Sequence, residues 1–395
     1  MEKILVVGSG IVSPLGVTSD QVFNNLLLAK NNFKNEKRAY EKYGKNTLSS
    51  QIEISEFKKK IKQDLFLLRE SNSESYLEYV ITEALKDAKI SWTDLCKKRI
   101  AIVIGTNDGQ SGVLEKYLQS NSAFSQKYNI IWTLEKIAAK LGLKFFRAIS
   151  VFNTCTSSSI AIEIGERYLR ADMCDIVIAG SVDEFSKKTY AAFACVNAIS
   201  KGGCTPFSIK RDGITIGEGA GAVIMIKDNY ENQETIKNAY CEIVHSASSN
   251  DAKKLETPDK EGILLAYNKL FEFSSVSKEN IDCIVSHGTG TVNNDKEEID
   301  FLQLYFPKGV NVCSVKNFMG HMMSGSGICA AIIISEIFKK KIIPGYINYE
   351  TIDLGKCELI KRNKVNKTVQ YIINNTFGFG GNNTIILYKG IEKKG

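Results

Sequence analysis

Two series of short strand-like runs, arranged in corresponding order, constrain the fold of this chain more than any other feature. Short β-branched runs alternate with longer stretches of helical period, which is typical of an α/β fold. The first series, before residue 235, consists of residues 4–7, 100–104, 148–153, 175–179 and 221–226. The second series, after residue 235, consists of residues 242–245, 281–287, 310–315, 370–374 and 384–388. The matching order predicts an internal duplication, with halves at residues 1–235 and 236–395.

The third strand of each series shows the correspondence most clearly. In the first half, residues 148–152 lead through Cys155 into an apolar stretch over 158–169. In the second half, residues 311–315 lead through His321 into an apolar stretch over 325–338. Helices that are apolar around most of their circumference are buried between layers. The pattern therefore predicts a layered α/β/α/β/α body with its functional loops at one end.

Composition limits the class of protein. The 395 residues, 44% of them hydrophobic, are enough for one large domain or two closely fused ones. The ten cysteines show no zinc spacing and no disulfide framework, which favours free thiols in a reducing cytoplasm. The N-terminus lacks a signal-peptide layout, and the apolar run over 328–334 is too short to cross a bilayer. Six cysteines are expected to pack as small apolar side chains: Cys174, Cys195, Cys241, Cys283, Cys313 and Cys329.

The net charge of +7 is a modest basic excess that is spread along the chain. Basic residues gather at Lys58-Lys59-Lys60 and over residues 34–45. These stretches are either solvated faces or a docking surface for an acidic partner. No basic run is interleaved with aromatic residues, so the sequence does not favour nucleic acid as a partner.

Cys155 is the candidate nucleophile. It lies in Asn153-Thr154-Cys155-Thr156-Ser157-Ser158-Ser159, at the predicted start of a helix. Unpaired N–H groups at a helix start stabilise negative charge, so we expect a lowered pKa for this thiol and a site for an oxyanion. The alternative is a buried structural cysteine followed by a helix cap.

Two of the three histidines, His287 and His321, lie in glycine-containing turns that follow apolar runs. Each alone is more often a structural histidine. Together with a thiol, they form a set for acyl chemistry that holds a thioester carbonyl and stabilises an enolate. Both are expected to act as neutral imidazoles that donate from Nε2. The turn of His287 also contains Thr289 and Thr291 between glycines, which let a substrate approach the backbone closely.

Charged support is expected from Lys316, just after a strand, and from Glu298, on the helix that follows the His287 turn. We expect Glu298 to brace the loop of Lys316. Near the C-terminus, the glycine-rich turn over residues 375–383 carries Phe377 and Phe379 but no following Lys-Ser/Thr pair. An aromatic gate beside an exposed N–H fits this turn better than a phosphate cradle.

These residues together resemble the elongating β-ketoacyl-acyl carrier protein synthases of the thiolase-like superfamily. The resemblance runs nearly end to end. It is carried by six motifs in order: residues 8–16, Cys155, residues 206–221, residues 287–298, residues 316–321 and residues 375–382. The resemblance implies a duplicated, five-layered α-β-α-β-α fold and a homodimer built on the strand before the nucleophile, with a heterodimer as the alternative.

The resemblance also implies the catalytic roles. Cys155, His287 and His321 match the catalytic set, and Lys316 and Glu298 match its supporting pair. The N–H groups of Cys155 and Phe379 match the oxyanion hole, and Phe379 matches the gate; the substrate site is completed by Phe377, Thr289 and Thr291. The implied reaction condenses an acyl-cysteine with malonyl-carrier protein and loses CO2. No metal or bound cofactor is expected, because an acidic acyl carrier protein supplies phosphopantetheine in trans.

Some residues depart from the pattern of the family. Val292-Asn293-Asn294 replaces the usual Pro-Leu-Gly, and the Cys-Thr-Ser-Ser-Ser sequence after Asn153-Thr154 resembles polyketide-type synthases. Two alternative functions stay open at this point. A thiolase needs a second cysteine where this chain has Phe377–Gly381, and a non-catalytic chain-length partner usually lacks the nucleophile that Cys155 provides.

Overall fold

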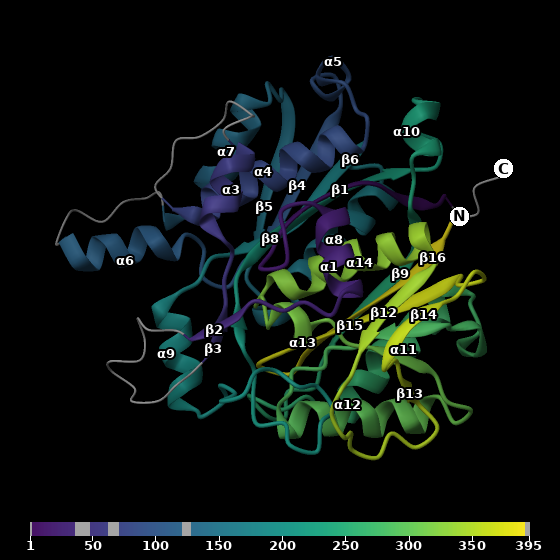
Figure 1. Cartoon of the computed structure of the whole chain (residues 1–395). Helices are drawn as coiled ribbons and strands as arrows, with labels where there is room; N and C mark the ends of the chain where they lie inside the picture. Colours follow the sequence, from purple (N-terminus) through teal and green to yellow (C-terminus); the bar gives the residue numbers. More distant parts are fainter. Residues whose placement is uncertain (1, 36–47, 62–70, 121–127, 392–395) are drawn as a thin grey trace.

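The computed structural model describes residues 2–35, 48–61, 71–120 and 128–391 (Figure 1). Most of the basic stretch over 34–45 lies outside these residues. Lys58 and Lys59 are exposed on helix α3 (Ile54–Ile61), as predicted for a solvated face.

An eleven-stranded sheet repeats one strand order in its two halves. The order is β5-β4-β6-β8-β1 in the first half, and β11-β10-β15-β16-β9 in the second, with β13 added beside β11. In each half, the first three strands are parallel to one another, and each of the last two is antiparallel to the strand before it. The two halves are joined where Ile4 of β1 pairs with Ile243 of β9. The strands are β1 (Ile4–Val12), β4 (Arg99–Gly105), β5 (Phe145–Val151), β6 (Ile176–Asp183), β8 (Gly219–Lys227), β9 (Cys241–Asn250), β10 (Cys283–Val285), β11 (Asn311–Cys313), β13 (Glu358–Leu359), β15 (Tyr371–Gly378) and β16 (Asn382–Gly390). The repeated order confirms the predicted duplication.

Three hydrophobic clusters separate five layers. One cluster lies between the first half-sheet and the outer helices α4 (Asn72–Asp87) and α7 (Ile130–Lys140). A second surrounds α8 (Ser157–Arg170) and α14 (Gly325–Lys340) between the half-sheets, and a third lies under α11 (Lys260–Ser274) and α12 (Val292–Tyr305). This arrangement confirms the predicted α-β-α-β-α architecture (Figure 1).

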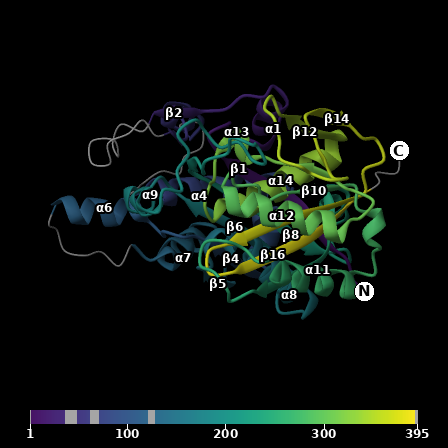
Figure 2. The same ribbon diagram turned by 90° about the horizontal axis from the view of Figure 1, so that it is seen from below.

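The remaining described elements lie around this body. Helix α6 projects away from it in both views (Figures 1 and 2). Small sheets pair β3 with β2 and β7, and β12 with β14. These elements are α1 (Ser19–Leu27), β2 (Phe33–Asn35), β3 (Leu48–Ser50), α5 (Trp92–Leu95), α6 (Ser111–Ser120), α9 (Lys187–Cys195), β7 (Ile216–Gly217), α10 (Gln233–Lys237), α13 (Lys316–Met319), β12 (Ile342–Tyr346) and β14 (Arg362–Val365).

The two central helices begin side by side, and this contact brings the two halves of the site together. The N–H of Ile328 in α14 donates to the hydroxyl of Ser158 in α8 at 3.0 Å. The helices approach so closely that a Cβ on Gly327 would lie 2.3 Å from the Ser159 hydroxyl. Because Cys155 precedes α8 and His321 precedes α14, this contact places both residues at the same end of the layers.

The cysteines agree with the prediction at all but one position. All ten are free thiols, and five of the six expected to pack are buried. The prediction is wrong for Cys195, which is the last residue of α9 and is exposed. Separately, no helix in the described ranges combines the length and the apolar composition needed to cross a membrane.

Candidate active site

The candidate residues follow strands of both half-sheets and meet where the two central helices begin. Strand β5 leads to Cys155 and β10 leads to His287. Strand β11 leads to Lys316 and His321, and β15 ends in the turn that contains Phe379. Because β10, β11 and β15 are parallel, the turns after them lie at one edge of the second half-sheet. The contact between the N-terminal ends of α8 and α14 brings Cys155 from the first half to the same place.

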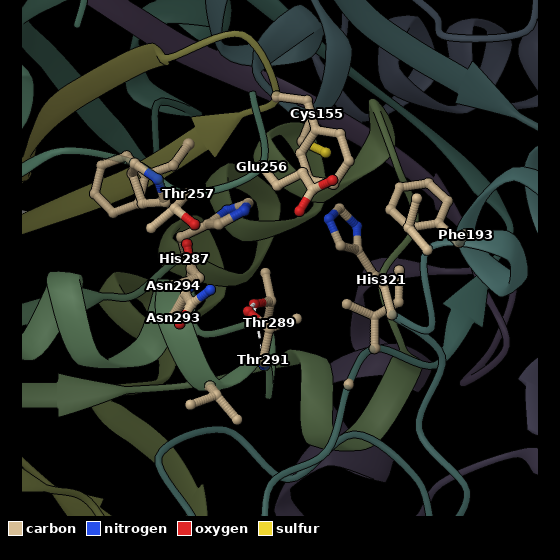
Figure 3. Close-up of a pocket in the computed structure, with 18 of the residues that line it drawn as sticks. Cys155, Phe193, Glu256, Thr257, His287, Thr289, Thr291, Asn293, Asn294 and His321 are labelled. Carbon is tan, nitrogen blue, oxygen red and sulfur yellow. Dashed lines mark hydrogen bonds between the residues drawn. The ribbon is translucent and has the colours of Figure 1, made fainter. Parts of the chain in front are cut away.

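A pocket of about 220 Å³ brings most of the predicted residues together (Figure 3). The predicted residues that line it are Cys155, His287, Thr289, Thr291, His321, Phe377 and Phe379. Lys316 and Glu298 are buried behind this lining and are not part of it. The sulfur of Cys155 and the rings of both histidines point into the same space (Figure 3).

Cys155 lies in a tight turn in front of α8. Thr154 has a φ of +52°, a left-handed conformation that a β-branched residue rarely adopts. The turn leaves Cys155 only 5% exposed, and burial raises the pKa of its thiol to about 12, although nearby Lys316 lowers it. The expected lowered pKa is therefore wrong, because loss of hydration outweighs the favourable position at the helix start.

The two imidazole rings lie edge to face, with their centroids 5.6 Å apart. Nδ1 of His321 accepts a hydrogen bond from the N–H of Met323 at 3.1 Å, so its proton is on Nε2. Burial lowers the pKa of both histidines well below 6.5, and the charge of Lys316 adds to this effect. The histidines are thus neutral at physiological pH, as the sequence predicts.

Lys316 and Glu298 both hold the backbone of the His287 turn. Glu298 accepts from the N–H groups of His287 and Gly288, each at 2.8 Å, and from the Asn375 amide at 3.1 Å. The ammonium group of Lys316 donates to the carbonyl of His287. The prediction that Glu298 braces the loop of Lys316 is therefore wrong: its donors are on the histidine turn and on β15. Burial raises the pKa of Glu298 to about 7.

The phenylalanine turn packs against both sides of the pocket. The ring of Phe377 contacts that of His287, with centroids 5.5 Å apart, and Phe379 contacts Phe193 of α9 at 5.4 Å. The hydroxyl of Thr154 donates to the carbonyl of Phe379 at 3.3 Å, which ties this turn to the one that carries Cys155.

The two threonines of the His287 turn contact each other on the opposite wall. The hydroxyls of Thr289 and Thr291 are 3.0 Å apart. Their turn is fixed by the buried carboxylate of Asp295, which accepts from the N–H groups of Thr289 and Gly290 at 2.9 Å and 3.2 Å. Both threonines therefore present polar groups to the pocket from a rigid loop.

Asp183, at the end of β6, is a supporting residue that the sequence did not reveal. Its buried carboxylate accepts from the Thr106 hydroxyl at 2.8 Å and from the N–H of Ser324 at 3.0 Å. It thus connects the loop after β4 to the residues that follow His321. Burial raises its pKa to about 6. The sequence did offer one signal for Asp183: it is an acidic residue that directly ends an apolar strand.

The described residues contain no group of three or more histidine, cysteine or carboxylate side chains placed to share a metal ion. The pocket combines one thiol, two neutral imidazoles and hydroxyl groups with two carboxylates, those of Asp212 and Glu256.

Two family models match the chain. Residues 1–230 match the N-terminal domain of the beta-ketoacyl synthases, and residues 240–350 match the C-terminal domain. The chain therefore belongs to the beta-ketoacyl synthase family, which confirms the predicted family. The predicted enzyme class, an acyltransferase that forms carbon–carbon bonds, is confirmed with it.

Similar proteins match over nearly their whole length. The chain is 24% identical to 3-oxoacyl-acyl-carrier-protein synthase 1 of Buchnera aphidicola, covering 98% of this chain and 99% of that relative. It is also 24% identical to synthase 2 of Staphylococcus aureus, covering 99% of each.

Solved structures show the same fold. The ishigamide ketosynthase/chain length factor has a TM-score of 0.89 at 24% identity, covering 99% of this chain and 100% of that one. A beta-ketoacyl synthase from Burkholderia phymatum has a TM-score of 0.85 at 21% identity, with the same coverage.

Proposed function

We propose that this protein is a β-ketoacyl-acyl carrier protein synthase that uses Cys155 as its nucleophile, with His287 and His321 at the reacting carbonyl. The observation that supports this most directly is the pocket in which one thiol faces two neutral imidazoles. The proposal places the nucleophile in residues 1–235 and both histidines in residues 236–395 of the duplicated chain.

In the first half-reaction, the sulfur of Cys155 attacks the carbonyl of an acyl-carrier thioester. The proton of the thiol passes to the departing carrier thiolate, so that an acyl-cysteine and a free carrier thiol are formed. The N–H groups of Cys155 and Phe379 stabilise the charge that develops on the carbonyl oxygen. The strained turn at Thr154 supports this role, because it brings Cys155 close to the phenylalanine turn.

In the second half-reaction, malonyl-carrier protein enters and its carbonyl accepts hydrogen bonds from Nε2 of His287 and His321. Loss of CO2 leaves an enolate, whose charge these donors stabilise. The enolate carbon attacks the acyl-cysteine, a carbon–carbon bond forms, and the Cys155 thiolate leaves and takes up a proton. The product is a β-ketoacyl thioester two carbons longer. Lys316 and Glu298 act by holding the His287 turn.

We propose that an acidic acyl carrier protein delivers phosphopantetheine in trans, and that no further cofactor is bound. One similar structure is titled as a ketosynthase in complex with its acyl-carrier protein. The chain has a net charge of +7, which suits an acidic partner. The ten free thiols support a location in a reducing cytoplasm.

We further propose a homodimer through strand β5, with a heterodimer as the alternative. This strand is at the edge of the sheet, and the exposed fractions of Phe145, its first residue, and Phe152, just after its end, are 62% and 59%. Exposed edges of this kind are usually covered by a partner. Similar structures are titled as complexes of a ketosynthase with a chain length factor, which supports the alternative.

Intact-protein mass spectrometry tests the nucleophile. Incubation with an acyl-carrier protein is expected to add one acyl group to the wild type and none to Cys155→Ala. Cys195→Ala is the matched control, because Cys195 is exposed and outside the pocket. An adduct that persists in Cys155→Ala would contradict the assignment.

Release of CO2 from malonyl-carrier protein tests the histidines. His287→Ala and His321→Ala are each expected to lower the rate at least about 100-fold, because each removes a donor to the enolate. The third histidine, His245, lies on β9 outside the pocket, so His245→Ala is expected to keep the wild-type rate. Normal decarboxylation by both pocket variants would remove the proposed roles.

A further inference from the structure

The rim of the pocket carries a carboxylate that the proposed reaction does not use. Glu256 lies on the exposed loop between β9 and α11, and its side chain is turned into the pocket (Figure 3). The loop is fixed to the phenylalanine turn by two backbone hydrogen bonds. The N–H of Gly380 donates to the carbonyl of Leu255 at 2.8 Å, and the N–H of Asp251 donates to Gly381 at 2.9 Å. The position of Glu256 is therefore set by the turn that contains Phe379.

Glu256 is an acceptor without a protein donor. Among the described residues, none donates a hydrogen bond to its carboxylate or forms an ion pair with it. The other carboxylate at the pocket, Asp212, accepts instead from the hydroxyl of Ser200 and from the N–H of Lys201. The described residues that line the pocket include no lysine or arginine, and its two histidines are held neutral by burial.

The place of Glu256 determines which part of a substrate it meets. Cys155 is 5% exposed at the base of the pocket, whereas Glu256 is exposed at the rim. A thioester that reaches Cys155 from a carrier outside must extend its arm past the rim. The segment beside Glu256 is thus the arm, and the acyl group lies deeper. The phosphopantetheine arm contains two amide groups, each with one N–H donor.

We propose that Glu256 determines specificity for the arm, by accepting a hydrogen bond from one of its amide N–H groups. This inference rests on the proposed function of the pocket. A hydrogen bond to a charged acceptor is stronger than one between neutral groups, and an arm that lacks the N–H cannot form it. The same carboxylate repels an anionic group at this position, so it selects against arms with a carboxylate there.

Analogues of the arm test the proposal. The substrates are the acyl thioesters of pantetheine and of two analogues, in each of which an ester oxygen replaces one amide nitrogen. With the wild type, we expect acylation of Cys155 to be at least about 10-fold slower for one analogue than for pantetheine. With Glu256→Ala, this ratio should fall below about twofold. The adduct on Cys155 is followed by intact-protein mass spectrometry.

Controls separate this proposal from a structural effect and from the proposed function. Glu256→Ala should keep the acylation rate of the analogue that the wild type uses poorly, which shows that the pocket is intact. Glu272→Ala, at an exposed position on α11 outside the pocket, should discriminate as the wild type does. Equal discrimination by the wild type and Glu256→Ala would overturn the inference alone. Absence of any adduct in the wild type, with pantetheine and carrier thioesters alike, would overturn the proposed function as well.

Discussion

Gly378 holds the closest approach between the phenylalanine turn and the turn of the nucleophile. A Cβ added at this position would lie 2.2 Å from the hydroxyl oxygen of Thr154 and 3.4 Å from the N–H nitrogen of Cys155. Ordinary van der Waals contact begins at about 3.4 Å, so Gly378→Ala requires a shift of roughly 1 Å. The side chain of Thr154 cannot absorb this shift easily, because its oxygen is attached directly to a branched Cβ and bonds to Phe379.

The shift moves the nucleophile relative to the phenylalanine turn. Overpacking of this kind costs about 1–3 kcal/mol of stability. The cost in rate is larger, since a displacement of about 1 Å at a reacting group lowers a rate on the order of 100-fold. We therefore expect Gly378→Ala to fold, with a melting temperature a few degrees lower, and to form the acyl adduct on Cys155 about 100-fold more slowly.

A second substitution makes the reasoning specific. Thr154→Ala removes the clashing oxygen, so the double variant with Gly378→Ala should regain at least about 10-fold in the rate of acylation over Gly378→Ala alone. Gly202→Ala is the matched control, because nothing lies within 4 Å of its added Cβ. The rates are measured by time-resolved intact-protein mass spectrometry with one acyl-carrier protein. A double variant as slow as Gly378→Ala would refute the proposed clash.

Three further substitutions test the supporting residues. Lys316→Met should slow decarboxylation at least about 10-fold, because the His287 turn loses a charged donor, and should also slow acylation of Cys155, because the charge that lowers the pKa of its thiol is gone. Burial raises the pKa of Glu298 to about 7 from 4.5, so the stability that its proton provides is present below pH 4.5 and lost as the pH rises through 7. In urea denaturation, the wild type should therefore lose roughly 3 kcal/mol more than Glu298→Gln between these pH values, and equal losses would contradict this. Asp183→Asn should lower the free energy of unfolding by about 1–3 kcal/mol, because one buried donor loses its acceptor; an unchanged urea midpoint would argue against this role.

The fold could be predicted because its strands and central helices differ in pattern from the rest of the chain. The ten predicted strand runs correspond to the ten strands of the two half-sheets. Helix α14 is buried from Gly325 to Phe338, and this stretch contains one charged residue, so its sequence already indicates a place between layers. The small strands β2, β3, β7, β12 and β14 were not predicted, because they are two to five residues long and depend on tertiary contacts.

The sequence could predict which residues belong to the candidate site, but not the environment in which they lie. Turns after strand-like runs indicated Cys155, His287 and His321, whereas the contact between α8 and α14 that brings them together is a tertiary contact. The pKa of the thiol could not be predicted, since it depends on how deeply the layers bury the turn. Glu256 has no local motif, and its place at the rim results from backbone contacts with a hairpin more than 100 residues away.

The resting site is neutral where the chemistry occurs, and this follows from burial. Burial raises the pKa of Cys155 and lowers the pKa of both histidines, so a thiol and two uncharged imidazoles face the pocket. A permanent thiolate would repel the carboxylate of an incoming malonyl group, whereas the neutral thiol or acyl-cysteine does not. No lysine or arginine among the described lining residues holds that carboxylate in place. Under the proposed function, the malonyl group therefore gains little as a carboxylate, while its enolate gains two imidazole donors. This difference between the two states would favour loss of CO2.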